Sequence, residues 1–110
     1  MSYHVYITED ADKDLRAIFS YIAYELLSFE NAAGQLVRLQ KEISSLEDMP
    51  ERYQRYELEP WCSRGVRRLP VDNYCVFYLP NRERRSVDIL RILYAGSDMD
   101  RTMTEYDDIV

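Results

Sequence analysis

The sequence GVRRLPVDNYCVFY, residues 65–78, contains segments rich in Val and Tyr that are joined by the polar pair Asp72-Asn73. It predicts strands at Val66–Leu69 and Tyr74–Leu79, joined through Asp72-Asn73. A third segment, Val87–Tyr94, is almost continuously apolar, which indicates a central strand. Residues 80–85 connect it to the second strand, so these three strands should form an antiparallel meander.

The first half of the chain predicts one strand and two helices. Residues 1–7 alternate as a short strand does. Thr8 can cap a helix whose apolar residues repeat at helical spacing as far as Leu26. Ser28 offers a second cap, and a second amphipathic helix is expected from about Glu30 to Glu47. Because so few residues separate the helices, they should fold back as a hairpin.

The predicted fold class is α+β, with a short N-terminal strand and an antiparallel helical hairpin packed on one face of a small, mainly antiparallel β-sheet. Residues 1–98 are expected to form this single domain, and residues 99–110 an acidic C-terminal tail. A chain of 110 residues leaves no room for a two-domain enzyme.

Charge is distributed unevenly along the chain. The net charge is −6, which argues against broad binding to nucleic acid or to an anionic membrane. Residues 1–50 carry −5 and residues 92–110 carry −4, whereas residues 51–91 carry nine Arg and six acids, a net +3. This distribution permits a sheet that faces a polyanion in a protein that is acidic overall.

Several classes of chemistry are poorly supported. With one histidine, His4, and two cysteines, Cys62 and Cys75, neither a histidine-based triad nor a His/Cys zinc site has recognisable spacing. No metal or cofactor is expected. The start of the chain lacks the pattern of a signal peptide, and no apolar run approaches 18 residues. We therefore expect a cytoplasmic protein with reduced thiols and no membrane partner.

Three motifs together carry a family resemblance. The first predicted helix follows the pattern DL..I..YI from Asp14 to Ile22, and the strands follow G.R.L.V.NY.VFY and V.I.RI.Y in residues 65–78 and 87–94. In these residues, and over roughly residues 3–98, the chain resembles the RelE/ParE toxin superfamily of bacterial type II toxin–antitoxin modules, which includes plasmid stabilisation toxins. The resemblance implies a small toxin that a cognate antitoxin neutralises, with operator DNA bound only indirectly through that antitoxin.

The resemblance leaves the target open between two mechanisms. RelE-like members cleave messenger RNA on the ribosome, and ParE-like members poison DNA gyrase. Cleavage by a 2′-hydroxyl requires a base, an acid and cations for the phosphorane charge. For a RelE-like nuclease the resemblance implies two Arg and, downstream of the last strand, a Tyr. The two Arg positions hold Cys75 and Ser97 here, and only Tyr106 could stand in for the downstream Tyr. A ParE-like gyrase inhibitor is therefore favoured; the alternatives are a RelE-like endoribonuclease and a degenerate, non-toxic antitoxin-binding homologue.

The candidate site residues lie mainly on the predicted strands. Catalytic candidates, should the protein be a nuclease, are Arg67, Arg91 and Tyr94. Candidates for binding the target or the antitoxin are Arg67, Arg68, Tyr74, Tyr78, Arg91, Tyr94 and Asp98.

Each candidate also has a structural interpretation. Arg67 and Arg68 should point to opposite faces of a strand, so that one of them could pair with Glu57, Glu59 or Asp72. If Arg91 is buried it requires a partner, for which Asp98 and Asp88 are candidates. The tyrosines could serve sheet packing, Trp61 could cover the irregular segment 51–65, and the cysteines could be inert small apolar residues.

Overall fold

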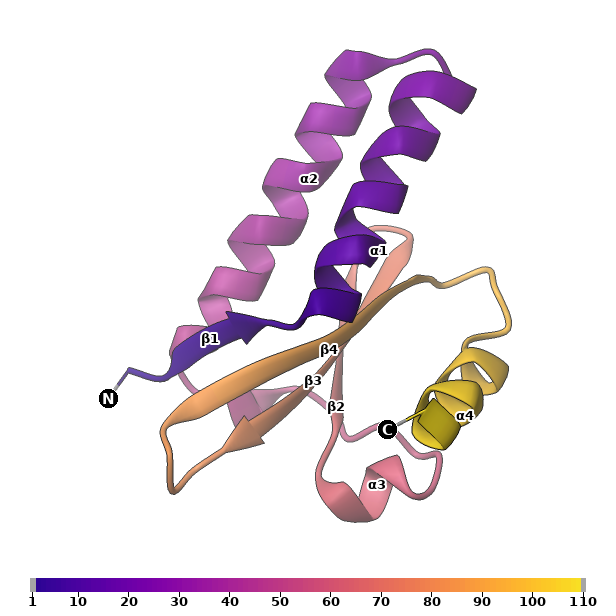
Figure 1. The fold of residues 1–110 in the computed structure, drawn as a ribbon. Helices are drawn as coiled ribbons and strands as arrows, with labels where there is room; N and C mark the ends of the chain where they lie inside the picture. Colours follow the sequence, from indigo (N-terminus) through magenta and orange to yellow (C-terminus); the bar gives the residue numbers. More distant parts are fainter. Residues whose placement is uncertain (1, 110) are drawn as a thin grey trace.

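The computed structural model describes residues 2–109, and the side chains of residues 2–106. A four-stranded sheet lies between two helical layers (Figure 1). In chain order the elements are β1 (His4–Ile7), α1 (Glu9–Ser20), the π-helix η1 (Tyr21–Glu25), α2 (Phe29–Ser44), the 3₁₀-helices η2 (Ser45–Glu47) and η3 (Pro50–Arg52), α3 (Trp61–Arg64), β2 (Arg67–Val71), β3 (Tyr74–Asn81), β4 (Ser86–Tyr94) and α4 (Met99–Ile109).

The sheet has the order β1-β4-β3-β2 and is mixed. The predicted meander is confirmed, because β2 pairs antiparallel with β3 and β3 antiparallel with β4. β1 pairs parallel with β4, from His4 opposite Ser86 to Ile7 opposite Ile89. β4 therefore has neighbours on both sides only over its first half. Beyond Ile89 its free side adjoins the start of α1, which packs on β4.

The helical hairpin covers one face of the sheet (Figure 1). Both predicted caps are confirmed: the Thr8 side chain accepts a hydrogen bond from the Ala11 N–H, and the Ser28 side chain accepts one from the Asn31 N–H. The Thr8 hydroxyl also donates to the Ile89 carbonyl over 2.7 Å, so the cap ties α1 to β4.

The first helix ends earlier than predicted. α1 stops at Ser20, and the π-helix η1 replaces the expected continuation to Leu26. The wider turn keeps Ile22 and Ala23 buried against α2. It leaves Leu26 more than half exposed, whereas the helical spacing predicts a core position.

The main core lies between the hairpin and the sheet. Both β3 and β4 contribute to it, although the alternation along β4 is interrupted where the pairing register with β3 shifts between Ile89 and Arg91. The buried set includes Leu15, Leu39, Ile43, Leu46, Val76, Tyr78, Ile89 and Ile92. These apolar side chains supply most of the driving force for folding, at roughly 25 cal/mol per Å² removed from water.

A second core lies on the other face of the sheet, under α3 and α4. It contains Cys75, Phe77 and Leu93 from the strands, with Trp61 and Met103 from the helices. Trp61 is buried as predicted, and its indole N–H donates to the Met103 carbonyl over 3.1 Å. The segment expected to be irregular thus contains η3 and α3.

Residues 99–109, which composition alone sets apart as an acidic tail, form α4. Met99, Met103 and Tyr106 recur at i, i+4 and i+7 and give this helix an apolar side, which packs on the sheet. Among the described residues, no helix is long and apolar enough to span a membrane.

Candidate functional site

The predicted site residues do not form one cluster. The sheet separates them into three places: the start of β2, the junction of α1 with β4 and α4, and the far end of β4. Each place is formed by a different set of contacts, and these contacts decide which side chains are available to a partner.

Arg67 and Arg68 start β2, and their side chains point to opposite faces, as predicted. Arg67 donates from Nη1 to the Tyr53 carbonyl over 2.7 Å and lies 3.9 Å from the Glu51 carboxylate. The predicted partners Glu57, Glu59 and Asp72 are therefore wrong for Arg67, which lies beside Glu51 of η3 instead. The predicted partner Asp72 pairs with Arg38 instead, at 2.7 Å. These contacts favour a structural role for Arg67 over a role in binding a partner.

Tyr78 is fully buried between β3 and the hairpin, and its hydroxyl donates to the Pro50 carbonyl over 2.6 Å. Burial raises the pKa of this phenol, so it stays protonated in the folded protein. In this conformation Tyr78 offers no surface to a target or an antitoxin.

Arg91 forms a bidentate pair with Asp14 of α1. Its Nε and Nη2 donate to the two carboxylate oxygens over 2.8 and 3.0 Å, and the same carboxylate accepts the Ile92 N–H over 2.9 Å. The hydrogen bond with Asp14 raises the pKa of Arg91, against the opposing effect of burial. That Arg91 requires a partner is confirmed, but the predicted partners Asp98 and Asp88 are wrong. α1 supplies Asp14 because it packs on β4 beyond the end of β1.

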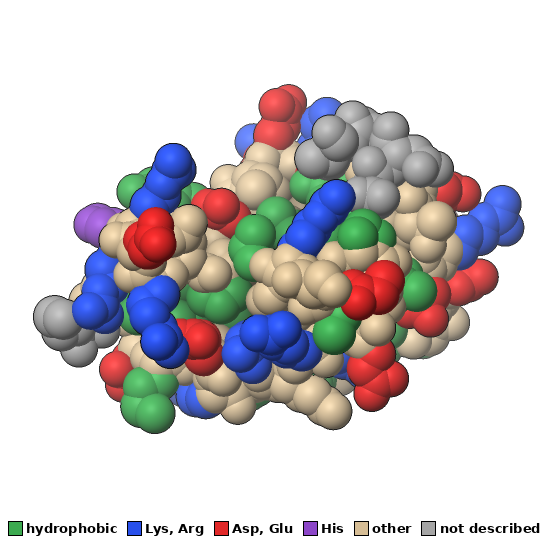
Figure 2. All heavy atoms as spheres, turned by 90° about the horizontal axis from the view of Figure 1, so that it is seen from below, with side chains coloured by type: hydrophobic (Ala, Val, Ile, Leu, Met, Phe, Trp, Pro, Cys, Tyr) green, Lys and Arg blue, Asp and Glu red, His purple; other side chains and the backbone are tan. Residues whose placement is uncertain are grey.

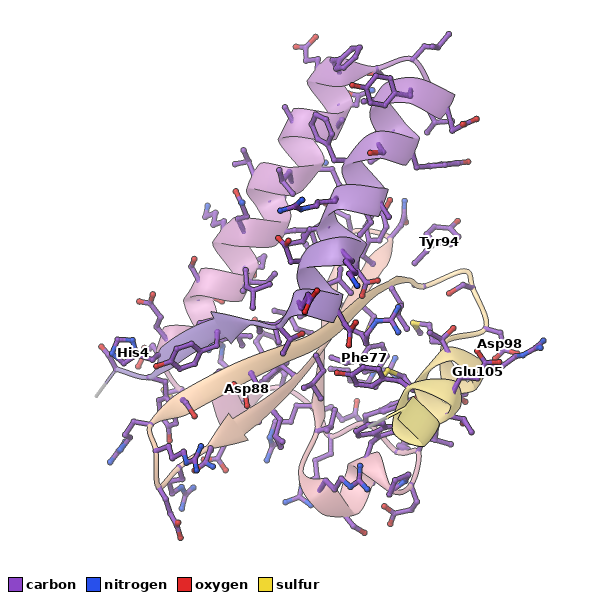
Figure 3. All side chains as sticks on the ribbon, viewed as in Figure 1. His4, Phe77, Asp88, Tyr94, Asp98 and Glu105 are labelled. Carbon is purple, nitrogen blue, oxygen red and sulfur yellow. The ribbon has the colours of Figure 1, made fainter. Side chains whose placement is uncertain are left out.

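Tyr74 and Tyr94 meet at the far end of the sheet, where they stand opposite each other in β3 and β4. Their rings approach edge to face at 6.0 Å. Tyr94 is 55% exposed and projects on the hairpin side of the loop that leads to α4 (Figure 3). Tyr74 is partly buried, and this burial, with the neighbouring phenols of Tyr94 and Tyr21, raises the pKa of its phenol.

These two tyrosines line a groove of about 710 Å³ between the hairpin and the end of the sheet. We call it the tyrosine groove; its walls are Ala17, Ile18, Tyr21, Ile22, Leu26, Asn31, Gln35, Arg38, Asn73, Tyr74 and Tyr94. Asp72 accepts hydrogen bonds from Gln35 over 3.0 Å and from Arg38 over 2.7 Å, which fastens α2 to the β2–β3 turn beside the groove. Aromatic and aliphatic walls with a few amides suit the binding of another macromolecule.

The sequence contains no clear signal for the hairpin side of this groove. Tyr21 and Ile22 belong to the motif of the first predicted helix, but the π-helix decides that Tyr21 turns outward while Ile22 stays buried. Large apolar side chains in a helix are by default core residues, so exposure at these positions requires the tertiary structure.

The basic character of residues 51–91 does not produce one basic face. Arg82 and Arg67 both approach Glu51, and Arg91 is paired with Asp14. Figure 2 shows the molecule from below, with basic and acidic side chains intermixed over this face. Among the described residues, no cluster of His, Cys, Asp or Glu could hold a metal ion.

Comparison with known proteins identifies the family. The model described as ParE toxin of type II toxin-antitoxin system, parDE, matches residues 5–99. The chain belongs to the ParE toxin family. A comparison with curated proteins gave no match.

Solved structures share the fold of this ParE-family toxin. A chain of the chromosomal ParDE system from P. aeruginosa is 20% identical, with a TM-score of 0.72, over 86% of this chain and 98% of that one. A chain of the RelBE2 toxin–antitoxin complex from Mycobacterium tuberculosis is 22% identical, with a TM-score of 0.59, over 86% and 99%. A mutant of the E. coli toxin RelE in the free state is 14% identical, with a TM-score of 0.65, over 97% and 98%.

The positions that matter for a nuclease are engaged structurally in this ParE-family toxin. Cys75 is buried under α4, and burial raises the pKa of its thiol to about 11, only partly offset by Arg68. The Ser97 hydroxyl donates to the Tyr94 carbonyl over 2.6 Å. Tyr106 stacks on Trp61 with ring centres 5.7 Å apart, and burial raises the pKa of its phenol.

Asp98 directly precedes α4, and its carboxylate accepts the Arg101 N–H over 3.3 Å. Figure 3 shows it beside α4, across the connecting loop from Tyr94. Of the seven residues predicted to bind a partner, the structure brings only Tyr74 and Tyr94 together on an open surface.

Proposed function

We propose that this ParE-family toxin inhibits DNA gyrase by binding it through the tyrosine groove, and that a cognate antitoxin neutralises the toxin. Under this proposal the protein acts by binding and not by cutting RNA. It reaches operator DNA only through the antitoxin.

One observation carries the preference for binding. The two positions where a RelE-like nuclease has Arg hold Cys75, which is buried, and Ser97, which is hydrogen-bonded to backbone. The phenol of Tyr106 has a raised pKa and lies in the second core, so it is a poor acid or base near neutral pH. Arg91 is held by Asp14. These residues together supply neither a base nor a free cation for RNA cleavage.

The tyrosine groove supports a binding role by its composition. It offers two tyrosines from the sheet, apolar residues from α1 and η1, and the polar side chains of Asn31, Gln35 and Arg38 from α2. Tyrosines present apolar area with a polar tip at low entropic cost, and they are enriched where proteins bind one another. The paired charges of Arg38 and Asp72 keep one wall of the groove in place.

The test compares two tyrosines of equal exposure. Tyr94 and Tyr6 are each 55% exposed, but Tyr94 lines the groove and Tyr6 lies on β1. In a supercoiling assay with purified gyrase, Tyr94→Ala should weaken inhibition about tenfold or more, as loss of a central interface aromatic does. Tyr6→Ala should inhibit as the wild type does.

Three outcomes would contradict the proposal. Equal effects of the two substitutions would remove the groove from the binding surface. Codon-linked cleavage of messenger RNA on programmed ribosomes, with gyrase unaffected, would establish the RelE-like alternative. Normal growth on induced expression of folded protein without antitoxin would establish the degenerate, non-toxic homologue.

A further inference from the structure

We propose that this toxin forms a homodimer through the outer side of α2, in a contact that leaves the tyrosine groove free. The contact is a line of apolar side chains that we call the α2 ridge, made of Phe29, Ala33 and Val37. These residues are spaced i, i+4 and i+8, so they form one row along the helix, roughly 12 Å long at 1.5 Å per residue.

The ridge lies outside the buried cores of the folded monomer. All three side chains are exposed, with Phe29 at 58% and Val37 at 61%. The core-facing side of α2 is a different row, formed by Ala32, Gln35, Leu39 and Ile43. Helical periodicity places the ridge on the other side of α2 from Asn31, Gln35 and Arg38, which line the tyrosine groove. The ridge is therefore an exposed apolar surface that lies outside both the buried cores and the proposed gyrase-binding groove.

The ridge continues onto the tip of the hairpin. Tyr24 packs edge to face on Phe29 with ring centres 5.2 Å apart, and Tyr24 is itself 61% exposed. Leu27, at the tip, is 84% exposed and has a φ of 53°, a left-handed conformation that costs energy for a branched side chain. Figure 1 shows this part of the hairpin projecting beyond the sheet, where a second molecule can reach it.

A second copy fits the ridge in an antiparallel arrangement. A two-fold axis at Ala33, the smallest of the three, lets the two helices approach closely and sets Phe29 of each copy against Val37 of the other. Glu30 and Lys41 lie on the same flank of α2, near opposite ends of the ridge. The antiparallel pairing brings Glu30 of each copy toward Lys41 of the other, so the charges are complementary. Among the described residues neither has an ion-pair partner within the chain.

The available area suits a weak dimer. Tyr24, Leu27, Phe29 and Val37 are each more than half exposed. A fully buried aromatic side chain contributes about 150–250 Å², so these four offer on the order of 500 Å² per copy. A standard interface takes roughly 800 Å² from each partner, which the flanking residues of α2 can complete. Two hairpins side by side would form a four-helix layer.

The experiment measures the molecular mass of the full chain by sedimentation equilibrium, up to about 100 µM, a range that covers dimers of this size. Wild-type protein should be in monomer–dimer equilibrium. Ala33→Arg places two like charges at the two-fold axis and should weaken the dimer at least tenfold. The helix tolerates Arg well at an exposed position. Asn31→Arg, on the groove side of the same helix, is the matched control and should dimerise as the wild type does.

A charge exchange tests the antiparallel geometry. Glu30→Lys and Lys41→Glu should each weaken the dimer by about threefold or more, and the double variant should restore it. A wild type that is monomeric at about 100 µM would overturn the proposal. So would equal effects of Ala33→Arg and Asn31→Arg, or a double variant no better than the single ones. Loss of antitoxin capture by Ala33→Arg, with a monomeric wild type, would assign the ridge to the antitoxin instead.

The outcome is separable from that of the proposed function. Because the ridge and the tyrosine groove lie on different sides of α2, Ala33→Arg should still inhibit gyrase if the groove binds it. A failure of dimerisation therefore leaves the gyrase test unaffected, and the reverse also holds.

Discussion

Arg91 and Asp14 show at the scale of single residues how the structure assigns a role that spacing leaves open. An arginine inside an apolar strand is either a contact residue or half of an ion pair. Here the side chains are 21% and 14% exposed, and the carboxylate also accepts a backbone N–H. The guanidinium lies 5.5 Å from the Tyr106 ring, so the pair links β4, α1 and α4. Its geometry accounts for Arg91 without any target.

Replacing Arg91 with Ala should therefore lower stability. The change leaves a mostly buried carboxylate without its cation, and breaking such a pair costs about 3 kcal/mol of unfolding free energy. Urea denaturation measures the loss. A double-mutant cycle with Asp14→Ala should show strong coupling, because the second change removes the unpaired charge. Lost toxicity with an unchanged denaturation curve would instead show that Arg91 contacts the target.

At the scale of elements, α4 shows that a segment with an acidic composition can still form a helix with a buried apolar side. Composition sets residues 99–110 apart as a tail, yet Met99, Met103 and Tyr106 align on one side of a helix. Trp61 supplies both a stacking surface for Tyr106 and an N–H for the Met103 carbonyl. The partner of this helix lies about 40 residues earlier in a stretch without periodicity, so a local pattern does not reveal the contact.

Met103→Ala should destabilise the second core. Met103 is fully buried, and truncating a buried Met to Ala costs about 2–5 kcal/mol. The single tryptophan reports on the same place, so its emission should shift to longer wavelength as the indole becomes more hydrated. Arg101→Ala, on the exposed side of α4, is the control and should stay within about 0.5 kcal/mol of the wild type. Similar losses for both variants would mean that α4 does not pack as described.

At the scale of the whole molecule, one sheet is shared by two cores. Neighbouring residues of β3 point to opposite faces, with Phe77 toward α4 and Tyr78 toward the hairpin. Figure 3 shows Phe77 on the α4 side. Both cores also bury ionisable groups in their neutral form, among them Cys75 and Tyr78. Both cores should therefore be destabilised at alkaline pH, where these groups ionise.

Stability should fall in alkaline solution. Burial raises the pKa of the Cys75 thiol from 9.0 to about 11, so this group favours the folded state below pH 9. As the pH rises from 9 to 11, the thiol ionises in the unfolded chain first and the advantage is lost, by about 2 kcal/mol. Urea denaturation of wild type and Cys75→Ala across this range measures the contribution. Parallel pH profiles would show that Cys75 is not buried as a neutral thiol.

The sequence by itself determined the first strand, the two helices of the hairpin and the three strands of the meander, with their order, because hydrophobic periodicity and capping residues are local. Thr8, Ser28 and the Val- and Tyr-rich segments in residues 65–78 indicate two helices and an antiparallel meander, and the motifs indicate the superfamily. Tertiary structure alone decided the rest: the parallel β1, the π-helix that exposes Leu26, Asp14 as the partner of Arg91, and the tyrosine groove. Each of these depends on residues far apart in the chain or on a helix register that changes within one turn. Spacing along the sequence carries no information about such contacts.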